Sequence, residues 1–200
     1  MIKVLQLIFE PTMTWEKIAQ AKWRARSVFL LYLLPLLLLT LAAELAGMSR
    51  WGKAGEYLGR PTEFGGRLKV SDHILILYGA AQFLASLWLV AYGAVLVRKL
   101  THTFNNRQTY TQCFTVTAYA LGPLFLLRLC DAAPSMNPWV SFAIGIVLTV
   151  AILYHGIPWV LEPDPPHAFG LYLCSSLLLA CLSGIARYLT LLLLAQNFRF

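Results

Sequence analysis

Charged residues are scarce in this sequence. Only 12% of its 200 residues are charged, where soluble domains average about 25%. Hydrophobic residues make up 58% of the chain, and the mean hydropathy is +0.65. This composition excludes an ordinary soluble domain and is typical of a polytopic membrane protein. The net charge is +7, but no Lys/Arg run or RNA-binding motif accompanies it, so we expect no nucleic-acid partner.

Motifs of enzymes and of cofactor sites are also missing. The sequence has no G-x-S-x-G, Walker, G-x-G-x-x-G or H-E-x-x-H pattern. Its four cysteines form no C-x-x-C pair and lie in or beside apolar runs, which indicates small buried hydrophobic residues. His155, Glu162 and His167 match no metal-binding spacing. We therefore predict no catalytic residue, no metal and no cofactor.

Long apolar runs are what the chain has in abundance. Five of them approach the ~20 residues that a helix needs to cross a bilayer. They predict membrane spans at residues 28–46, 74–97, 111–129, 139–159 and 168–195. The predicted fold class is all-α, with residues 28–200 forming a transmembrane bundle of five helices.

Residues 1–27 precede the first predicted span and are predicted to form an interfacial segment. Thr14 can cap an amphipathic helix there, with Trp15 and Ile18 on its apolar face. Such a helix would lie in the membrane interface, with Trp15 at the level of the lipid headgroups. A signal peptide is the competing interpretation, but no A-x-A site follows the apolar run.

Basic residues predict the orientation of the chain. The loops carry eight Lys and Arg residues on the side of the N-terminus and seven on the other side, which is nearly a tie. Lys22, Arg24 and Arg26 directly precede the first span. Because the first helix usually decides the topology, this cluster favours a cytoplasmic N-terminus and a C-terminus outside.

The segment 104–123 is the most polar of the long apolar segments. On a helix, part of it falls on one stripe: Gln108, Gln112, Thr115, Tyr119 and Gly122. Polar groups in hydrocarbon need partners, so this polar stripe should face other helices and not lipid. Pro123 removes a backbone donor, which predicts a kink. The stripe is either a packing surface, which we prefer, or the lining of a transport path.

Four charged residues lie near the ends of odd-numbered spans. Glu44 ends the first span, Arg128 and Asp131 end the third, and Arg187 lies toward the end of the fifth. Odd-numbered spans run in the same direction, so all four residues approach one membrane face. A charge near a span is costly without a partner. We predict that Arg187 pairs with Glu44 or Asp131, and we prefer a structural role over substrate coordination.

The segment between the last two spans carries two acidic residues and one histidine among prolines: Glu162, Asp164 and His167. The prolines predict a stiff loop that holds the carboxylates outward. Such a loop beside basic neighbours indicates either mutual salt bridges or a docking surface for a protein partner.

Several short segments resemble one family. Residues 118–123 (A-Y-A-L-G-P) resemble the Tyr-then-Pro signature in the third helix of the Yip family, the Ypt/Rab-interacting membrane proteins. Residues 8–18 are similar to the Pro…Trp…Ile lead-in of its bacterial branch. Residues 154–156 and 168–170 fit the end of the fourth helix and the start of the fifth. The resemblance implies a five-helix protein of the bacterial inner membrane with a cytoplasmic N-terminus. Eukaryotic relatives contact Rab GTPases, but the bacterial branch works without them, so a role in vesicle traffic is not implied.

Two functions follow as hypotheses. The first is a non-enzymatic membrane protein that scaffolds or modulates lipid organisation or a membrane partner, either another protein or a second copy. The second is a small transporter or lipid-moving protein, with the polar stripe as its path and Pro123 as hinge. A continuous wet cavity joining Gln112, Tyr119 and Arg187 would favour the second, and a dry, tightly packed stripe would favour the first.

Overall fold

The computed structural model describes residues 2–21, 23–51, 53–54, 67–68, 72–104, 108–133 and 136–196. Two short helices come first, α1 (Ile2–Phe9) and α2 (Pro11–Ala21). The first span is built from α3 (Ala25–Val28), a π-helical turn η1 (Phe29–Leu33) and α4 (Leu34–Trp51). A two-residue ladder, β1 (Lys53–Ala54) with β2 (Arg67–Leu68), precedes the remaining helices.

The second span is α5 (Asp72–Thr103). The third consists of α6 (Tyr110–Ala120), α7 (Gly122–Leu127) and a 3-10 turn η3 (Arg128–Ala132). The last two are α8 (Pro138–Leu161) and α9 (Pro165–Gln196). The described residues thus contain five helices long and apolar enough to cross a membrane, which confirms the predicted all-α class and a multi-pass membrane protein.

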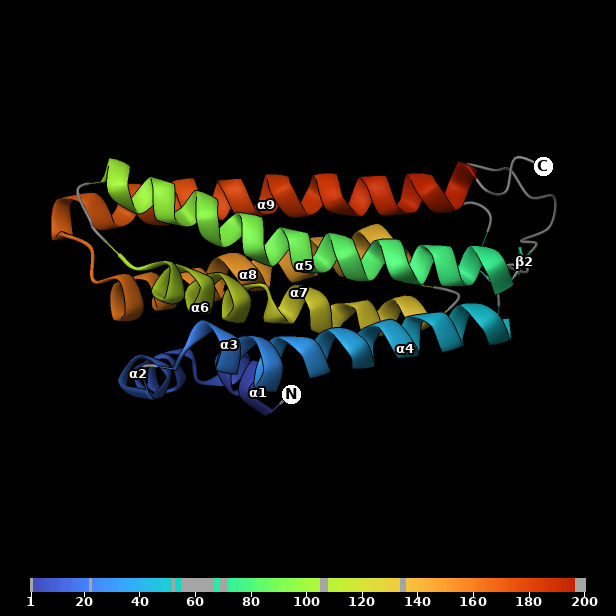
Figure 1. Cartoon of the computed structure of the whole chain (residues 1–200), viewed down its shortest axis with the longest axis horizontal. Coiled ribbons are helices and arrows are strands. Elements are labelled where there is room, and N and C mark those ends of the chain that lie inside the picture. Colours follow the sequence, from blue (N-terminus) through green and yellow to red (C-terminus); the bar gives the residue numbers. More distant parts are fainter. Residues whose placement is uncertain are drawn as a thin grey trace.

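The spans lie side by side and alternate in direction (Figure 1). One end of the bundle holds α2, and we call it the α2 end. The other holds the start of α5 and the end of α9, and we call it the Trp51 end because α4 ends there. The first, third and fifth spans all run from the α2 end to the Trp51 end, as the parity of the spans predicts.

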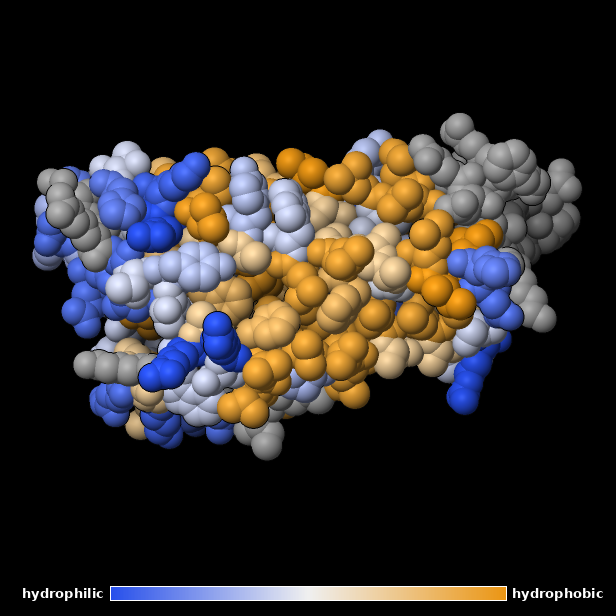
Figure 2. Space-filling view, in the orientation of Figure 1, coloured by the Kyte–Doolittle hydropathy of each residue, from blue (hydrophilic) through white to orange (hydrophobic). Residues whose placement is uncertain are grey.

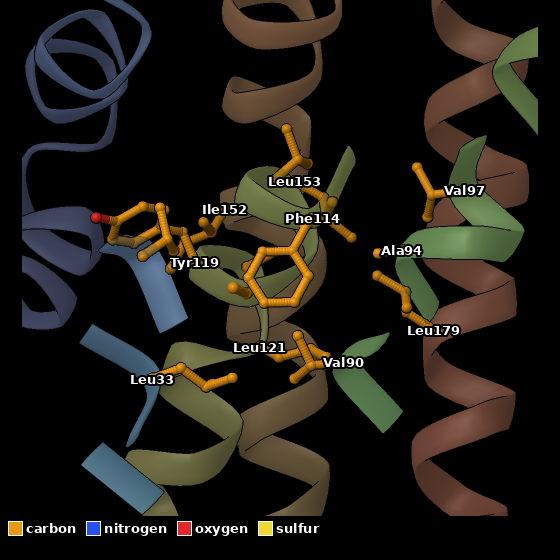
Figure 3. Close-up of a cluster of buried hydrophobic side chains, with 14 of the residues drawn as sticks. Leu33, Val90, Ala94, Val97, Phe114, Tyr119, Leu121, Ile152, Leu153 and Leu179 are labelled. Atoms are coloured by element: carbon orange, nitrogen blue, oxygen red, sulfur yellow. The ribbon is translucent and has the colours of Figure 1, made fainter. Parts of the chain in front are cut away.

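The third span is the central helix of the bundle. Its apolar window is 72% buried, whereas the other four windows are 33–39% buried. Figure 3 shows Phe114, Tyr119 and Leu121 of this span among side chains of neighbouring helices. Its small residues, threonines and alanines for the most part, let other helices approach closely. The segment that is the most polar is therefore also the best shielded from lipid.

The outer surface of the bundle is apolar. In Figure 2, hydrophobic side chains form a band across the middle of the molecule, and hydrophilic ones gather toward its ends. Leu31, Leu84, Val147 and Leu177 are all more than half exposed. Since exposure of this kind is favourable only in hydrocarbon, this surface contacts membrane lipids.

Two spans are irregular, and each irregularity lies next to a proline. The third span breaks at Leu121, which has φ −76° and ψ −6°, and Pro123 stands in the first turn of α7. This break is the irregularity that Pro123 predicts. In the first span, the N–H of Leu34 donates to the carbonyl of Phe29, one residue farther back than in an α-helix. This π turn ends two residues before Pro35, which has no N–H to donate.

Two residues of the N-terminal segment differ from the prediction. Trp15 does not lie among lipid headgroups: it is fully buried, and its indole N–H donates to the carbonyl of Ile152 at 3.1 Å. Thr14 is no cap either, because α2 begins at Pro11 and the Thr14 hydroxyl donates to the Glu10 carbonyl. The apolar face of α2 covers the bundle instead of the bilayer surface. Lys22, part of the predicted basic cluster, is outside the described residues.

Candidate functional site

The four charged residues predicted to share one membrane face meet inside the bundle, toward the Trp51 end. We call Glu44, Arg128, Asp131 and Arg187 the charge cluster. Glu44, Asp131 and Arg187 are no more than 3% exposed. Two acidic and two basic side chains balance each other, which is what hydrocarbon surroundings require.

Arg187 forms an ion pair with Asp131, one of the two partners predicted for it. The second carboxylate oxygen of Asp131 accepts a hydrogen bond from the Ser141 hydroxyl at 2.6 Å. The three side chains come from α9, the 3-10 turn η3 and α8. Both oxygens of the buried carboxylate therefore have a donor, as a charge of this kind needs.

Glu44 and Arg128 also bind groups on α5. The Tyr78 hydroxyl donates to Glu44 Oε1 at 2.6 Å, and Arg128 Nη1 donates to the Ser86 hydroxyl at 2.8 Å. Gln82 lies between Tyr78 and Ser86 along α5. With its amide oxygen turned to the guanidinium, it accepts from Arg128 Nη1 at 2.6 Å and donates to Thr190 Oγ1 at 3.1 Å.

This network draws on every one of the five spans. The residues that sequence reasoning left out of the cluster are Tyr78, Gln82, Ser86, Ser141 and Thr190. A signal for three of them is present, because Tyr78, Gln82 and Ser86 are spaced four residues apart and so share one face of α5. Ser141 and Thr190 carry no comparable signal, since single hydroxyls are common in membrane helices.

Two small cavities border the charge cluster. Each has a volume of about 10 Å³, which is room for roughly one water molecule. One borders Glu44 and Arg128, and the other borders Arg128, Asp131 and Arg187. Nε and Nη1 of Arg187 have no hydrogen-bond partner among the described residues. Water can therefore complete this network, but neither cavity admits a larger solute.

The polar stripe begins at the α2 end as a set of contacts to α8. Gln108 Nε2 donates to the carbonyl of Leu161 at 2.7 Å, and Gln112 Nε2 lies 3.5 Å from the carbonyl of Val160. These are terminal carbonyls of α8, which have no partner within that helix. Gln112 also closes a capping box with Thr109 at the start of α6. The stripe faces other helices here, as predicted.

Further along, the stripe ends in packed aromatic rings. The ring of Tyr119 lies 4.2 Å from that of Tyr32 and 6.0 Å from that of Trp15, measured between centroids. Two glycines make room for them: a Cβ on Gly156 would lie 2.5 Å from the Trp15 ring, and one on Gly122 would overlap the Tyr32 hydroxyl. We call these five residues the aromatic junction. It joins α2, the π turn, both halves of the third span, and α8.

A larger cavity lies at the α2 end, beside the start of the stripe. Its volume is about 410 Å³. It is bordered by residues of three segments: Ile18, Ala19 and Trp23; Thr109, Thr111, Gln112 and Thr115; Trp159, Val160 and Glu162. The cavity thus reaches Gln112 and Thr115 of the stripe. Tyr119, one turn further, does not border it and is 2% exposed.

The predicted docking loop is shorter than expected. Glu162, Asp164 and His167 are all exposed, as predicted. However, α9 begins at Pro165, so His167 stands in the first turn of a helix and its ring lies 6.3 Å from that of Phe104. Proline suits the first helical positions, which explains the early start. Glu162 ends α8 in the left-handed conformation, with φ 39°.

The fold and its contacts define a class: a polytopic helical membrane protein whose five spans are joined by a buried, charge-balanced network. Within that class, the Yip1 domain matches residues 5–188 of the chain. The chain therefore belongs to the Yip1 domain family, which confirms the resemblance. Neither the curated proteins nor the solved structures gave a match to it.

Proposed function

We propose that this protein is a non-enzymatic scaffold that organises lipids or a membrane-protein partner, and that it moves no solute across the bilayer. The packing of the polar stripe carries the proposal. Tyr119 is 2% exposed and its ring touches Tyr32 and Trp15. The stripe is open to the surface only as far as Thr115, so its centre has the dry, packed character of a helix contact and not of a path.

The charge cluster supports the same proposal from the Trp51 end. Its charges are neutralised inside the protein, and each of its two cavities has room for about one water molecule. A protein is strongly destabilised when one partner of a buried ion pair is removed. A substrate that displaced Asp131 from Arg187 would have to replace that contact. We assign the cluster a structural role, holding the five spans together.

The α2 end carries the surfaces that would meet a partner. We propose that this end is cytoplasmic and that the membrane is the bacterial inner membrane. Glu162, Asp164 and His167 are exposed there, on the side where the basic residues Arg24 and Arg26 precede the first span. A protein partner or a second copy would dock on this acidic segment, and membrane lipids would surround the bundle.

Purified protein in sealed vesicles tests the proposal against the transport alternative. We expect no flux of small fluorescent solutes and no acceleration of lipid exchange between leaflets, measured with a quenchable fluorescent lipid. Tyr119→Ala, which removes the central ring of the aromatic junction, should destabilise the protein without opening a path, because the charge cluster still closes the Trp51 end. Tyr188→Ala is the matched control, because that tyrosine is 56% exposed and outside the junction. Flux through the wild-type protein that Gln112→Leu abolishes would refute the scaffold.

One observation favours the alternative, a small transporter or lipid-moving protein. The cavity of about 410 Å³ opens at the start of the polar stripe, where a path would begin. For the path to continue, Tyr119 and Tyr32 would have to separate, with Pro123 as the hinge. Their centroids lie 4.2 Å apart, so this opening would break a packed contact.

A further inference from the structure

We infer that the cavity at the α2 end binds the headgroup of phosphatidylethanolamine through its ammonium. This inference rests on the proposed role in lipid organisation and names the lipid. The cavity volume of about 410 Å³ falls within the ~300–1,000 Å³ typical of small-ligand pockets. Its size and its bordering side chains suit a site for a lipid headgroup better than an ordinary gap between packed helices.

The position of the cavity is that of a lipid headgroup. It lies where the first and third spans begin and where α8 ends. Trp23 and Trp159 border it and are 37% and 42% exposed. Tryptophan gathers at the boundary between hydrocarbon and water, where headgroups lie. A lipid in the surrounding bilayer would therefore reach the cavity without leaving the membrane.

The chemistry of the lining selects a cation. Among the described residues, Glu162 is the only charged one that borders the cavity, and its carboxylate forms no ion pair with another of them. Indole rings attract cations through their faces. Of the remaining polar groups, the Thr109 and Thr115 hydroxyls donate to Gln112 Oε1 and to the Thr111 carbonyl. The Thr111 hydroxyl and the second N–H of the Gln112 amide are left to donate to the lipid phosphate. A headgroup that carries both an ammonium and a phosphate matches the carboxylate and indole rings with its cation and the hydrogen-bond donors with its anion.

Among the common headgroups, ethanolamine fits best. Its primary ammonium has three N–H donors for the Glu162 carboxylate, whereas the quaternary ammonium of choline has none. Phosphatidylglycerol offers no cation, and its charge would be repelled by the carboxylate. We therefore expect the order ethanolamine, choline, glycerol in affinity.

A second cavity gives the acyl chains an apolar surface. It has a volume of about 370 Å³ and lies between α8 and α9. Trp159 borders both cavities, and Ile157, Phe169 and Tyr172 are among the apolar and aromatic residues of the second. A headgroup in the first cavity thus has apolar protein surface on the other side of the same indole.

Native mass spectrometry of the full chain in detergent tests the inference. Dioleoyl lipids with ethanolamine, choline or glycerol headgroups are added, and the bound fraction is measured. We expect phosphatidylethanolamine to bind about tenfold more tightly than phosphatidylglycerol, through one charge-assisted contact and the indole faces. Glu162→Gln should lower the affinity for the ethanolamine lipid to that of the choline lipid. Asp164→Asn, an exposed carboxylate two residues away that does not border the cavity, should leave it unchanged.

A second variant keeps the test decisive if Glu162→Gln fails to fold. Trp23→Leu should weaken the ethanolamine and choline lipids alike and leave phosphatidylglycerol unaffected. Equal binding of the three headgroups, or a preference for phosphatidylethanolamine that survives Glu162→Gln, would overturn the inference. If the vesicles show no flux and no headgroup preference is found, the scaffold stands and only the lipid assignment fails.

Discussion

The ion pair between Arg187 and Asp131 makes a quantitative prediction, because both partners are buried. Asp131→Asn would remove the negative charge and keep the shape of the side chain. Arg187 is 2% exposed, and Nε and Nη1 have no hydrogen-bond partner among the described residues. The variant therefore leaves a buried guanidinium without the anion that balances it.

Removing one partner of a buried ion pair costs about 3–5 kcal/mol, and we expect Asp131→Asn to lie in that range. Arg187→Met should cost about 3 kcal/mol, at the lower end, because Ser141 still donates to Asp131. The double variant should cost no more than about 3 kcal/mol, since it leaves no unpaired charge and Met fills much of the space. The two substitutions would then be strongly non-additive.

The measurement is the free energy of unfolding in mixed detergent micelles, from titration with SDS and helical circular dichroism. Ser183→Ala is the control on the same helix: Ser183 is 2% exposed and its hydroxyl donates to the Ala180 carbonyl of α9 itself. It should cost less than about 1 kcal/mol. Single variants that each cost below about 1 kcal/mol, or a double variant that equals their sum, would refute the structural role of the pair.

Two further predictions use the same titration. Gly156→Ala places a Cβ 2.5 Å from the Trp15 ring, so it should destabilise the protein by about 1–3 kcal/mol and shift the tryptophan emission. In Gly184→Ala the nearest atom is 3.9 Å away, so that change should be neutral or slightly stabilising, and equal effects of the two would contradict the packing. Tyr78→Phe removes the donor to Glu44 Oε1 and should cost about 1–3 kcal/mol. No measurable loss would mean that another group replaces the tyrosine hydroxyl.

The span count, the fold class and the end at which the charges gather could all be predicted from the sequence. The spans follow from length and apolar composition alone. The position of the charges follows from parity: with five spans, the C-terminal ends of the odd-numbered spans lie at the same membrane face. This argument needs no side-chain detail, which is why it brought Asp131 and Arg187 together. It could not choose between Asp131 and Glu44, because both lie at that face.

The N-terminal helix shows why the rest could not be predicted. An apolar stripe on a short helix has the same pattern whether it covers lipid or protein. Trp15 is buried because Gly156 leaves space for its ring and the Ile152 carbonyl accepts its N–H. The hydrogen bond joins residues 137 positions apart, and no local pattern reports such a distance.

The two ends of the bundle differ in a way that bears on the function. At the Trp51 end, the charge cluster and its partners draw on all five spans, so moving one helix there breaks contacts of buried charges. At the α2 end, the cavity of about 410 Å³ leaves the start of α6 and the end of α8 partly unpacked. The aromatic junction lies between these two regions. A ligand at the α2 end would therefore act on α2 and on the segment from Glu162 to His167, and the cluster would keep the other end fixed. This arrangement fits the proposed scaffold, whereas alternating access would require both ends to move.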